Sequence, residues 1–270
     1  MKKWITSAIL YLVIIIAVYH IYGLIESTNQ EASENTSDHA SHEHGAGEDD
    51  SHGAHHSGDS DVKAEVRVSG KGLNIYLIDK SGNPVEELEV NHEKLLHLII
   101  VDEHLDQYLH LHPDQIDVGV FQTNQQLPDG NYTAFVDIIP TGQSYSVEPI
   151  RFTIGEDEAH HAHDSLEPDK ELTKVVNKQE ATLEMSSTKA GEPVTLEFSL
   201  PGADLEPYLG AMGHVVILDE NAENYLHVHP TNYEETTFET TFDQPGIYKI
   251  WAEFQIAGEV LVFPYIVEIH

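Results

Sequence analysis

The sequence predicts an all-β protein made of two tandem immunoglobulin-like β-sandwiches. Residues 62–155 and 179–270 each divide into roughly seven short apolar runs, and no convincing helical period joins them. Each half also carries a tyrosine two residues after a glycine, at Tyr132 and Tyr248. This is the pattern of a tyrosine corner, in which the hydroxyl bonds upstream backbone at the start of one strand.

The predicted strands follow the same plan in both halves. In the first half they span 64–69, 73–79, 95–102, 108–112, 117–122, 132–139 and 147–154. In the second half they span 181–185, 194–200, 213–219, 225–229, 236–242, 248–255 and 260–269. Turn residues such as Gly82-Asn83-Pro84 separate the runs. Because order and spacing match, we interpret the halves as a repeat.

The N-terminal residues 1–25 have the composition of a membrane anchor. Lys2 and Lys3 precede an apolar run that extends from Trp4 to Ile25, which is long enough to span a bilayer as a helix. The run has no Ala-x-Ala-like cleavage site, so we predict an uncleaved signal anchor, with a cleaved secretory signal as the alternative. The positive-inside rule then predicts a single-pass protein of the cytoplasmic membrane whose C-terminal domains are extracytoplasmic, or secreted if the segment is cleaved.

Two polar segments are predicted to be linkers, at residues 26–61 and 156–178. Both are rich in acidic residues, and residues 26–61 contain almost no large apolar residue, so this first segment cannot bury enough surface to offset the entropy of ordering. They also contain clustered histidines: His39, His42, His44, His52, His55, His56, His160, His161 and His163. Histidine-rich tracts of this kind can bind metal loosely, and the alternative is a low-complexity spacer.

The charge of the chain excludes some partners. There are 13 Lys+Arg against 47 Asp+Glu, a formal net charge of −34, which repels phosphate backbones and therefore predicts no nucleic-acid partner. Cations are favoured instead. The chain contains no cysteine, so disulfides, thiolate metal sites and cysteine nucleophiles are excluded.

One histidine motif occurs twice with the same spacing. Tyr-Leu-His-Leu-His-Pro spans residues 108–113 and Tyr-Leu-His-Val-His-Pro spans 225–230, and each has another histidine 13 positions before its first histidine. If the two strands form a hairpin that pairs Val101 with Tyr108, the three histidines share one face and lie within reach of one metal ion. The predicted ligand sets are His97, His110 and His112 in the first half, and His214, His227 and His229 in the second.

A carboxylate follows at an equivalent position in each half. The strand expected to neighbour the histidine hairpin carries Asp137 in the first half and Glu253 in the second. Each is predicted to complete the three-histidine shell as a fourth ligand, or to orient a ligand histidine from outside it. His92 is a further candidate in the first half. The structural alternative is that the histidines are satisfied packing residues and that each His-Pro step only ends a strand.

The tracts from Asn91 to Pro113 and from Tyr208 to Pro230, with their His-Leu-His-Pro and His-Val-His-Pro steps, resemble a widespread group of bacterial secreted or membrane-anchored proteins. These proteins carry the signature in immunoglobulin-like domains. The resemblance covers both predicted sandwiches and implies an extracytoplasmic location, but it implies no particular activity. Exported copper-handling β-sandwich proteins are similar at the level of the fold alone.

These observations predict a membrane-tethered protein that captures or buffers a divalent metal ion outside the cytoplasm. Imidazole and carboxylate ligands suit Cu(II) and Zn(II): copper has the higher intrinsic affinity, and zinc is favoured by availability or tetrahedral geometry. Binding should weaken below about pH 6, because the ligand is neutral imidazole. We predict no enzymatic activity. The alternatives are a structural or adhesive module and, less favoured, a three-histidine metalloenzyme. The sequence identifies no protein partner.

Overall fold

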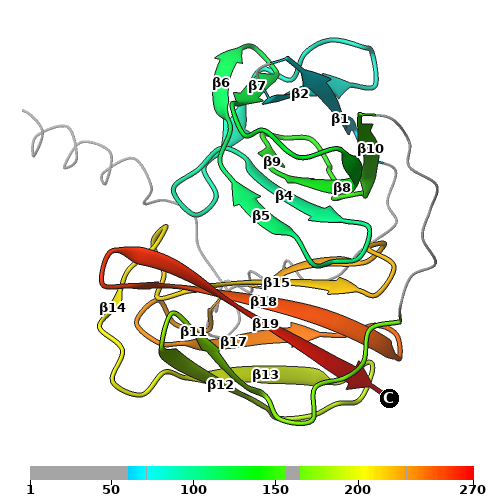
Figure 1. Cartoon of the computed structure of the whole chain (residues 1–270). Helices are drawn as coiled ribbons and strands as arrows, with labels where there is room; N and C mark the ends of the chain where they lie inside the picture. The colour runs from blue at the N-terminus through cyan, green and yellow to red at the C-terminus, as the bar shows by residue number, and fades with distance from the viewer. Residues whose placement is uncertain (1–59, 71, 156–164, 229) are drawn as a thin grey trace, which may run out of the picture. The chain divides into compact units, whose positions relative to one another are not determined.

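The computed structural model describes residues 60–70, 72–155, 165–228 and 230–270, and these form two β-sandwiches (Figure 1). The predicted all-β class is confirmed. The predicted signal anchor, nearly all of the first linker and the histidines at 160–163 lie outside the described residues. Within the described ranges, no helix is long and apolar enough to cross a membrane.

The first sandwich consists of two four-stranded antiparallel sheets and a small two-stranded one. One sheet has the order β1-β2-β7-β6, from β1 Val62–Ser69, β2 Gly72–Asp79, β7 Val120–Thr123 and β6 Asp114–Asp117. The second has the order β10-β8-β4-β5, from β10 Ile150–Ile154, β8 Gly130–Asp137, β4 His97–Asp102 and β5 Tyr108–Leu111. The small sheet pairs β3 Leu88–Glu89 with β9 Ile139–Pro140.

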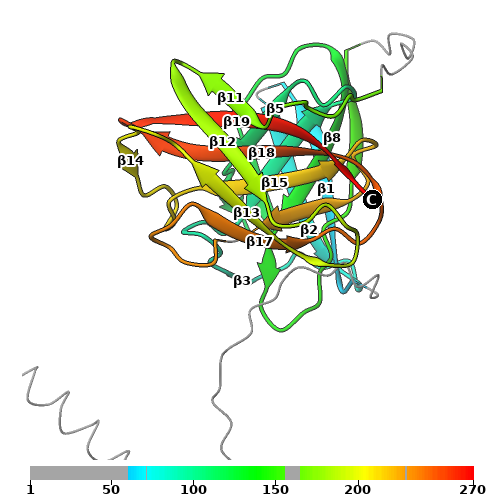
Figure 2. The same ribbon diagram turned by 90° about the horizontal axis from the view of Figure 1, so that it is seen from below.

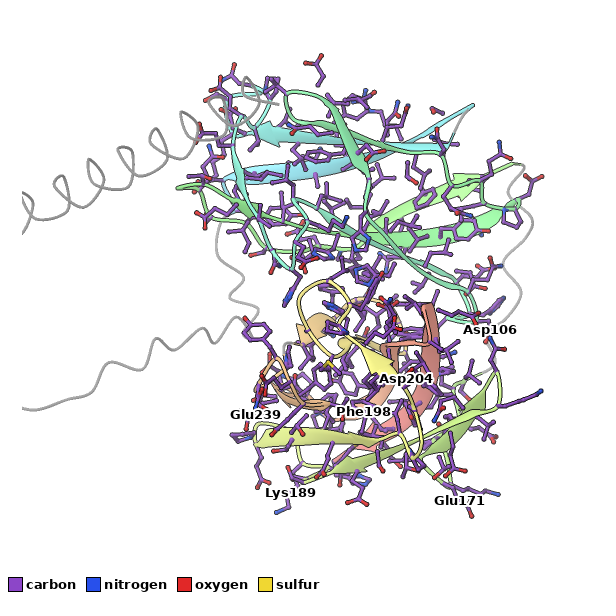
Figure 3. The ribbon with its side chains drawn as sticks, turned by 90° about the vertical axis from the view of Figure 1, so that its left-hand side faces the viewer. Asp106, Glu171, Lys189, Phe198, Asp204 and Glu239 are labelled. Carbon is purple, nitrogen blue, oxygen red and sulfur yellow. The ribbon has the colours of Figure 1, made fainter. Side chains whose placement is uncertain are left out.

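The second sandwich repeats this plan with longer C-terminal strands. One sheet has the order β11-β12-β13-β17, from β11 Thr173–Val176, β12 Gln179–Met185, β13 Pro193–Ser199 and β17 Thr237–Thr241. The other has the order β14-β18-β15-β16, from β14 Leu205–Glu206, β18 Gly246–Ile256, β15 His214–Asp219 and β16 Tyr225–Val228; β19 Glu259–Ile269 pairs with β18 (Figure 2). Phe198 lies between the two sheets, whereas Lys189 and Glu239 lie on the surface (Figure 3).

The two predicted tyrosine corners are present. The Tyr132 hydroxyl donates a hydrogen bond to the Pro128 carbonyl at 3.1 Å, and the Tyr248 hydroxyl donates to the Gln244 carbonyl at 2.9 Å. Each tyrosine therefore bonds backbone four residues upstream, at the start of β8 or β18. This local arrangement was readable from the sequence because the contact is short in sequence.

Two boundaries differ from the prediction. Strand β11 falls inside residues 156–178, which we predicted to be linker; its exposure alternates along the strand and it adds an edge to β12. Residues 117–122, predicted as one strand, divide between β6 and β7 at Gly119. Gly119 has a φ of +63°, and a Cβ there would lie 2.8 Å from the Leu77 carbonyl oxygen, so only glycine fits where the chain passes from β6 to β7.

The sheet containing β4 and β8 lies against the sheet containing β15 and β18 (Figure 1). Successive residues of β4 point to opposite sides: Leu98 and Ile100 belong to the core of the first sandwich, whereas Ile99 and Val101 pack with residues of the second. The shared buried cluster is Ile99, Val101, Leu105, Phe135, Val216, Leu218, Ala222, Tyr225 and Trp251. This cluster explains why β4 and β15 are buried on both faces.

Two equivalent pairs of aromatic residues stack across this junction, each with one ring from each sandwich. Tyr108 stacks on Trp251 with ring centroids 4.8 Å apart and planes at 13°. Tyr225, the equivalent of Tyr108, stacks on Phe135, the equivalent of Trp251, at 5.1 Å and 16°. Stacked aromatic pairs stabilise a contact by more than the burial of their apolar area alone. The junction is therefore a repeat-related pair of contacts, which brings the two histidine hairpins to a common surface.

Candidate metal centre

The histidine hairpin of the first sandwich has the register expected from the sequence. Strands β4 and β5 pair Val101 with Tyr108 and Ile99 with His110. The same pairing recurs in the second half, where Leu218 lies opposite Tyr225. The hairpin places the histidine-bearing ends of β4 and β5 together, at the junction of the sandwiches.

Three histidines of this hairpin form a compact cluster, which we call the triad: His97, His110 and His112. One ring nitrogen from each lies within 4.8 Å of the others. The ring centroids are 4.9 Å apart for His97 and His112, and 4.8 Å apart for His110 and His112. His97 has no exposed surface. Three imidazoles at this separation, of which those of His97 and His110 are buried, match the ligand set of a transition-metal site with an open position.

A tight turn before β4 orients His97. Asn91 and Lys94 pair across a two-residue turn whose central residues, His92 and Glu93, have φ values of 45° and 64°. The turn directs the Asn91 carbonyl oxygen to the Nε2 atom of His97 at 2.9 Å. A carbonyl only accepts hydrogen bonds, so Nε2 carries the hydrogen and neutral His97 has its lone pair on Nδ1. That atom is the one directed into the triad.

A carboxylate from the other sandwich orients His110. The Oε2 atom of Glu253, on β18, lies 2.7 Å from the Nδ1 atom of His110, and their side chains are only 4% and 1% exposed. Nδ1 donates to the carboxylate, and this leaves Nε2 facing the Nδ1 atom of His97 at 2.9 Å. Bonds of about 2 Å in tetrahedral geometry separate ligand nitrogens by about 3.3 Å, so a small opening admits an ion.

His214, the first histidine of the second predicted ligand set, makes the same kind of backbone hydrogen bond as His97. The Nε2 atom of His214 bonds the Tyr208 carbonyl oxygen at 2.8 Å, after a turn in which Leu209 and Gly210 have φ values of 51° and 80°. His214 is 1% exposed. Its predicted partners fall outside what the structure describes: His229 entirely, and the side chain of His227. The second site therefore stays a prediction.

The carboxylates of Asp137 and Glu253 each form a hydrogen bond with a residue of the other sandwich, which the sequence did not predict. Asp137 pairs with His97 in the backbone register, but its Oδ2 atom accepts a hydrogen bond from the Tyr225 hydroxyl of the second sandwich at 3.2 Å. Glu253 pairs with His214 in register, yet its carboxylate bonds His110 of the first sandwich. The sequence predicts that each acid contacts the histidines of its own sandwich, and for the Glu253–His110 contact this prediction is wrong. The face of the sheet that carries them packs on the other sandwich, which sequence spacing within one half cannot reveal.

Two further histidines border the triad. The rings of His92 and His214 are 5.1 Å apart, and the ring of His214 is 6.2 Å from that of His110. His92 therefore joins the cluster through the turn that also orients His97. His104 does not: its side chain is 37% exposed and lies 3.6 Å from Glu103.

Burial raises the pKa of the tyrosines around the centre. The pKa values of Tyr108 and Tyr225 are well above the ordinary value, first because both are buried and second because Glu253 and Asp137 respectively are negatively charged nearby. Burial, with a smaller effect of Glu253, raises the pKa of Tyr208 to about 12. These hydroxyls stay neutral at physiological pH and can donate hydrogen bonds to the carboxylates.

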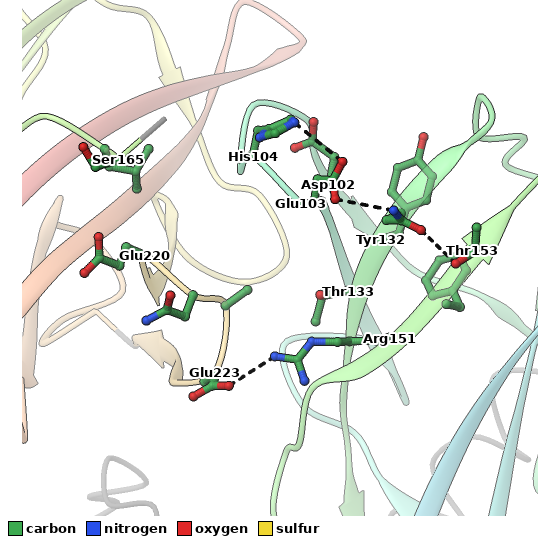
Figure 4. Close-up of a pocket in the computed structure, with 15 residues that line it drawn as sticks. Asp102, Glu103, His104, Tyr132, Thr133, Arg151, Thr153, Ser165, Glu220 and Glu223 are labelled. Atoms are coloured by element: carbon green, nitrogen blue, oxygen red, sulfur yellow. Dashed lines mark hydrogen bonds and ion pairs between the residues drawn. The ribbon is translucent and has the colours of Figure 1, made fainter. Parts of the chain in front are cut away.

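A cleft of about 610 Å³ lies at the other end of the junction (Figure 4). Acidic and amide side chains line it, including Asp102, Glu103 and Glu220, and Arg151 pairs with Glu223 across it at 3.3 Å. Both members of that ion pair are 61% exposed, so it contributes little stability. The cleft borders the end of β4 opposite to His97, and it contains no triad residue.

The repeat seen in the structure agrees with a known sequence family. The profile of a domain of unknown function, DUF8832, matches residues 54–155 and 174–270. The chain belongs to the DUF8832 family. The two DUF8832 matches coincide with the two sandwiches, and each contains one copy of the histidine motif. No curated protein matches the sequence.

Solved structures similar to this DUF8832 chain are β-sandwich proteins of low sequence identity. A two fibronectin type-III domain segment from chicken tenascin is 11% identical, and the match covers 78% of this chain and 99% of that one, with a TM-score of 0.24. The chicken CNTN1 FN1–FN3 domains are 10% identical over 77% and 66% of the two chains, with a TM-score of 0.23. These similarities carry no argument about function.

Proposed function

We propose that this protein binds one divalent transition-metal ion at the triad. The observation that carries the proposal is the pattern of hydrogen bonds behind the ligands. Asn91 holds the outer nitrogen of His97, and Glu253 holds the outer nitrogen of His110, so both remaining nitrogens converge. Such outer partners are typical of metal-bound histidines, because they set the tautomer and the ring orientation.

The donor set favours Cu(II) or Zn(II). The triad supplies three imidazoles and no thiolate, and the chain contains no cysteine. A three-histidine site with outer hydrogen bonds suits tetrahedral Zn(II), whereas Cu(II) has the higher intrinsic affinity for nitrogen ligands. The excess of acidic residues attracts either cation to the protein surface.

The broader proposal is a membrane-tethered, extracytoplasmic protein that captures or buffers this metal. It combines the triad with the predicted signal anchor and with the histidine-rich tracts, which would collect metal loosely before the buried site binds it. We propose binding and no catalysis, because the sequence contains no nucleophile motif. A structural module whose buried histidines only stabilise the junction is the second candidate, favoured by the His110–Glu253 contact between sandwiches.

Elemental analysis of the purified full-length chain tests the proposal. After loading with Zn(II) or Cu(II) and desalting, the variant His110→Ala with His112→Ala should retain about one equivalent less metal than the wild type. His104→Ala is the matched control, because it removes an exposed histidine near the same hairpin. Equal metal content in all three proteins would leave the structural module as the better function.

A further inference from the structure

We propose that Glu253 is a positioning residue for the triad, and that metal binding is therefore coupled to docking of the two sandwiches. This inference rests on the proposed function. It deepens that function by naming a residue from outside the ligand hairpin, 143 positions away in sequence, on which the site depends.

The first step of the argument is the burial of Glu253. It is 3% exposed, lies three residues before the end of β18, and its neighbours along the strand on the junction side include Trp251. A buried carboxylate is costly unless hydrogen bonds or an opposite charge compensate it. Its partner is the His110 imidazole at 2.7 Å, so the compensation comes from the other sandwich.

The second step is what this contact does to the ligand. An imidazole can rotate about its bond to Cβ, and it can carry its hydrogen on either nitrogen. The bond from Nδ1 to Glu253 selects the orientation in which Nε2 faces His97. When the sandwiches separate, His110 loses this partner, whereas His97 keeps its bond to Asn91 of its own sandwich. Of these two ligands, only His110 depends on docking for its orientation.

The third step is thermodynamic. If the docked state binds metal more tightly than the undocked state, metal must strengthen docking by the same factor. Loss of such an outer partner typically weakens metal binding by about 10-fold to 100-fold. We therefore expect docking to be favoured by a comparable factor when metal is bound. Metal binding at the triad would therefore stabilise one arrangement of the two sandwiches.

The first experiment compares Glu253→Gln with Glu268→Gln in the full-length chain. Glu268 is an exposed acid on the neighbouring strand β19, so it controls for loss of one negative charge. Zn(II) affinity, measured by competition with a chromophoric chelator, should fall about 10-fold to 100-fold in Glu253→Gln and stay unchanged in Glu268→Gln. Wild-type affinity in Glu253→Gln would overturn the inference and leave the proposed function intact.

Thermal melting separates positioning from simple structural support. A residue that only supports the fold would lower the melting temperatures of the metal-free and zinc-loaded proteins equally. Glu253→Gln should instead reduce the zinc-induced increase. If Glu253→Gln does not fold, Glu253→Asp replaces it, since Asp137 occupies the equivalent position of the first sandwich and its carboxylate is one methylene shorter. An undiminished zinc-induced increase would count against positioning.

Spin labels test the coupling itself. The chain has no cysteine, so single cysteines at Lys63 and Lys189, both well exposed and in different sandwiches, accept labels selectively. Saturating Zn(II) should narrow the distance distribution between the labels in the wild type and narrow it less in Glu253→Gln. Equal narrowing in both would overturn the coupling. Absence of triad-dependent zinc binding in the wild type would instead overturn the proposed function.

Discussion

The two sandwiches carry equivalent carboxylates on equivalent strands, yet the carboxylates have different partners. Asp137 accepts a hydrogen bond from the Tyr225 hydroxyl, whereas Glu253 binds His110. The Tyr108 hydroxyl, equivalent to that of Tyr225, lies near Glu253, whose negative charge, second to burial, raises the pKa of Tyr108.

The difference between the halves comes from one methylene and from burial. The glutamate side chain is one methylene longer than that of Asp137, and its carboxylate binds the His110 imidazole. The repeat therefore gives the junction two equivalent sets of contacts. The difference between Asp and Glu at one position places the Glu253 carboxylate beside the triad. A duplicated domain can acquire a new role at its junction by such a step while its two cores stay alike.

The largest expected effect tests how symmetric the apolar junction is. Phe135→Ala and Trp251→Ala each remove a fully buried, stacked ring, and each should lower the free energy of unfolding by about 3–5 kcal/mol. Urea denaturation measures both, with Val260→Ala, a partly exposed site, as the control that should change little. A large loss in only one of the two ring variants would show that the sandwiches contribute unequally.

A smaller effect is expected where the halves differ in charge. Lys249 is 7% exposed and donates a hydrogen bond to the Leu105 carbonyl oxygen of the first sandwich at 2.6 Å; the equivalent residue there is Thr133. Lys249→Thr leaves that carbonyl without its charged donor and should cost about 1–3 kcal/mol in urea denaturation. Lys189→Thr, at an exposed lysine, is the control. Unchanged stability in Lys249→Thr would contradict a bridging role.

The tyrosine pair gives a sharper test of the asymmetry. Tyr225→Phe removes a buried hydroxyl that donates to the partly buried Asp137 carboxylate and should cost about 1–3 kcal/mol, because the acceptor loses this donor. Tyr108→Phe removes a buried hydroxyl near Glu253 and should cost less, because the Glu253 carboxylate keeps its bond to His110. Chemical denaturation of both variants measures the difference. Equal losses of unfolding free energy would mean that Glu253 accepts a hydrogen bond from Tyr108 as well as from His110.

The smallest effect concerns alkaline pH. Because burial raises the pKa of Tyr208 to about 12, the unfolded chain loses this proton first as pH rises above about 10. The stability that neutral Tyr208 contributes is complete below about pH 10 and is lost as pH rises toward about 12. Melting temperatures measured from pH 8 to 11 should fall less steeply for Tyr208→Phe than for the wild type. An identical slope would show that Tyr208 does not contribute.

Much of the fold was predictable because it depends on contacts that are short in sequence. The strand plan, both tyrosine corners and the register that places Ile99 opposite His110 follow from alternation, turn residues and loop length. Strand β11 was missed because a short, half-exposed edge strand carries little apolar signal. The break at Gly119 was missed because the constraint is the neighbouring Leu77 carbonyl.

By itself, the sequence determined which residue types the centre contains and which strands carry them. His97, His110 and His112 share one face because side chains alternate along strands and a hairpin has a definite register. Only the tertiary structure decided that this face is buried against the second sandwich, and that Glu253 rather than Asp137 accepts the hydrogen bond from His110. Those contacts join residues more than a hundred positions apart, and no local periodicity or spacing encodes which of two equivalent acids reaches across.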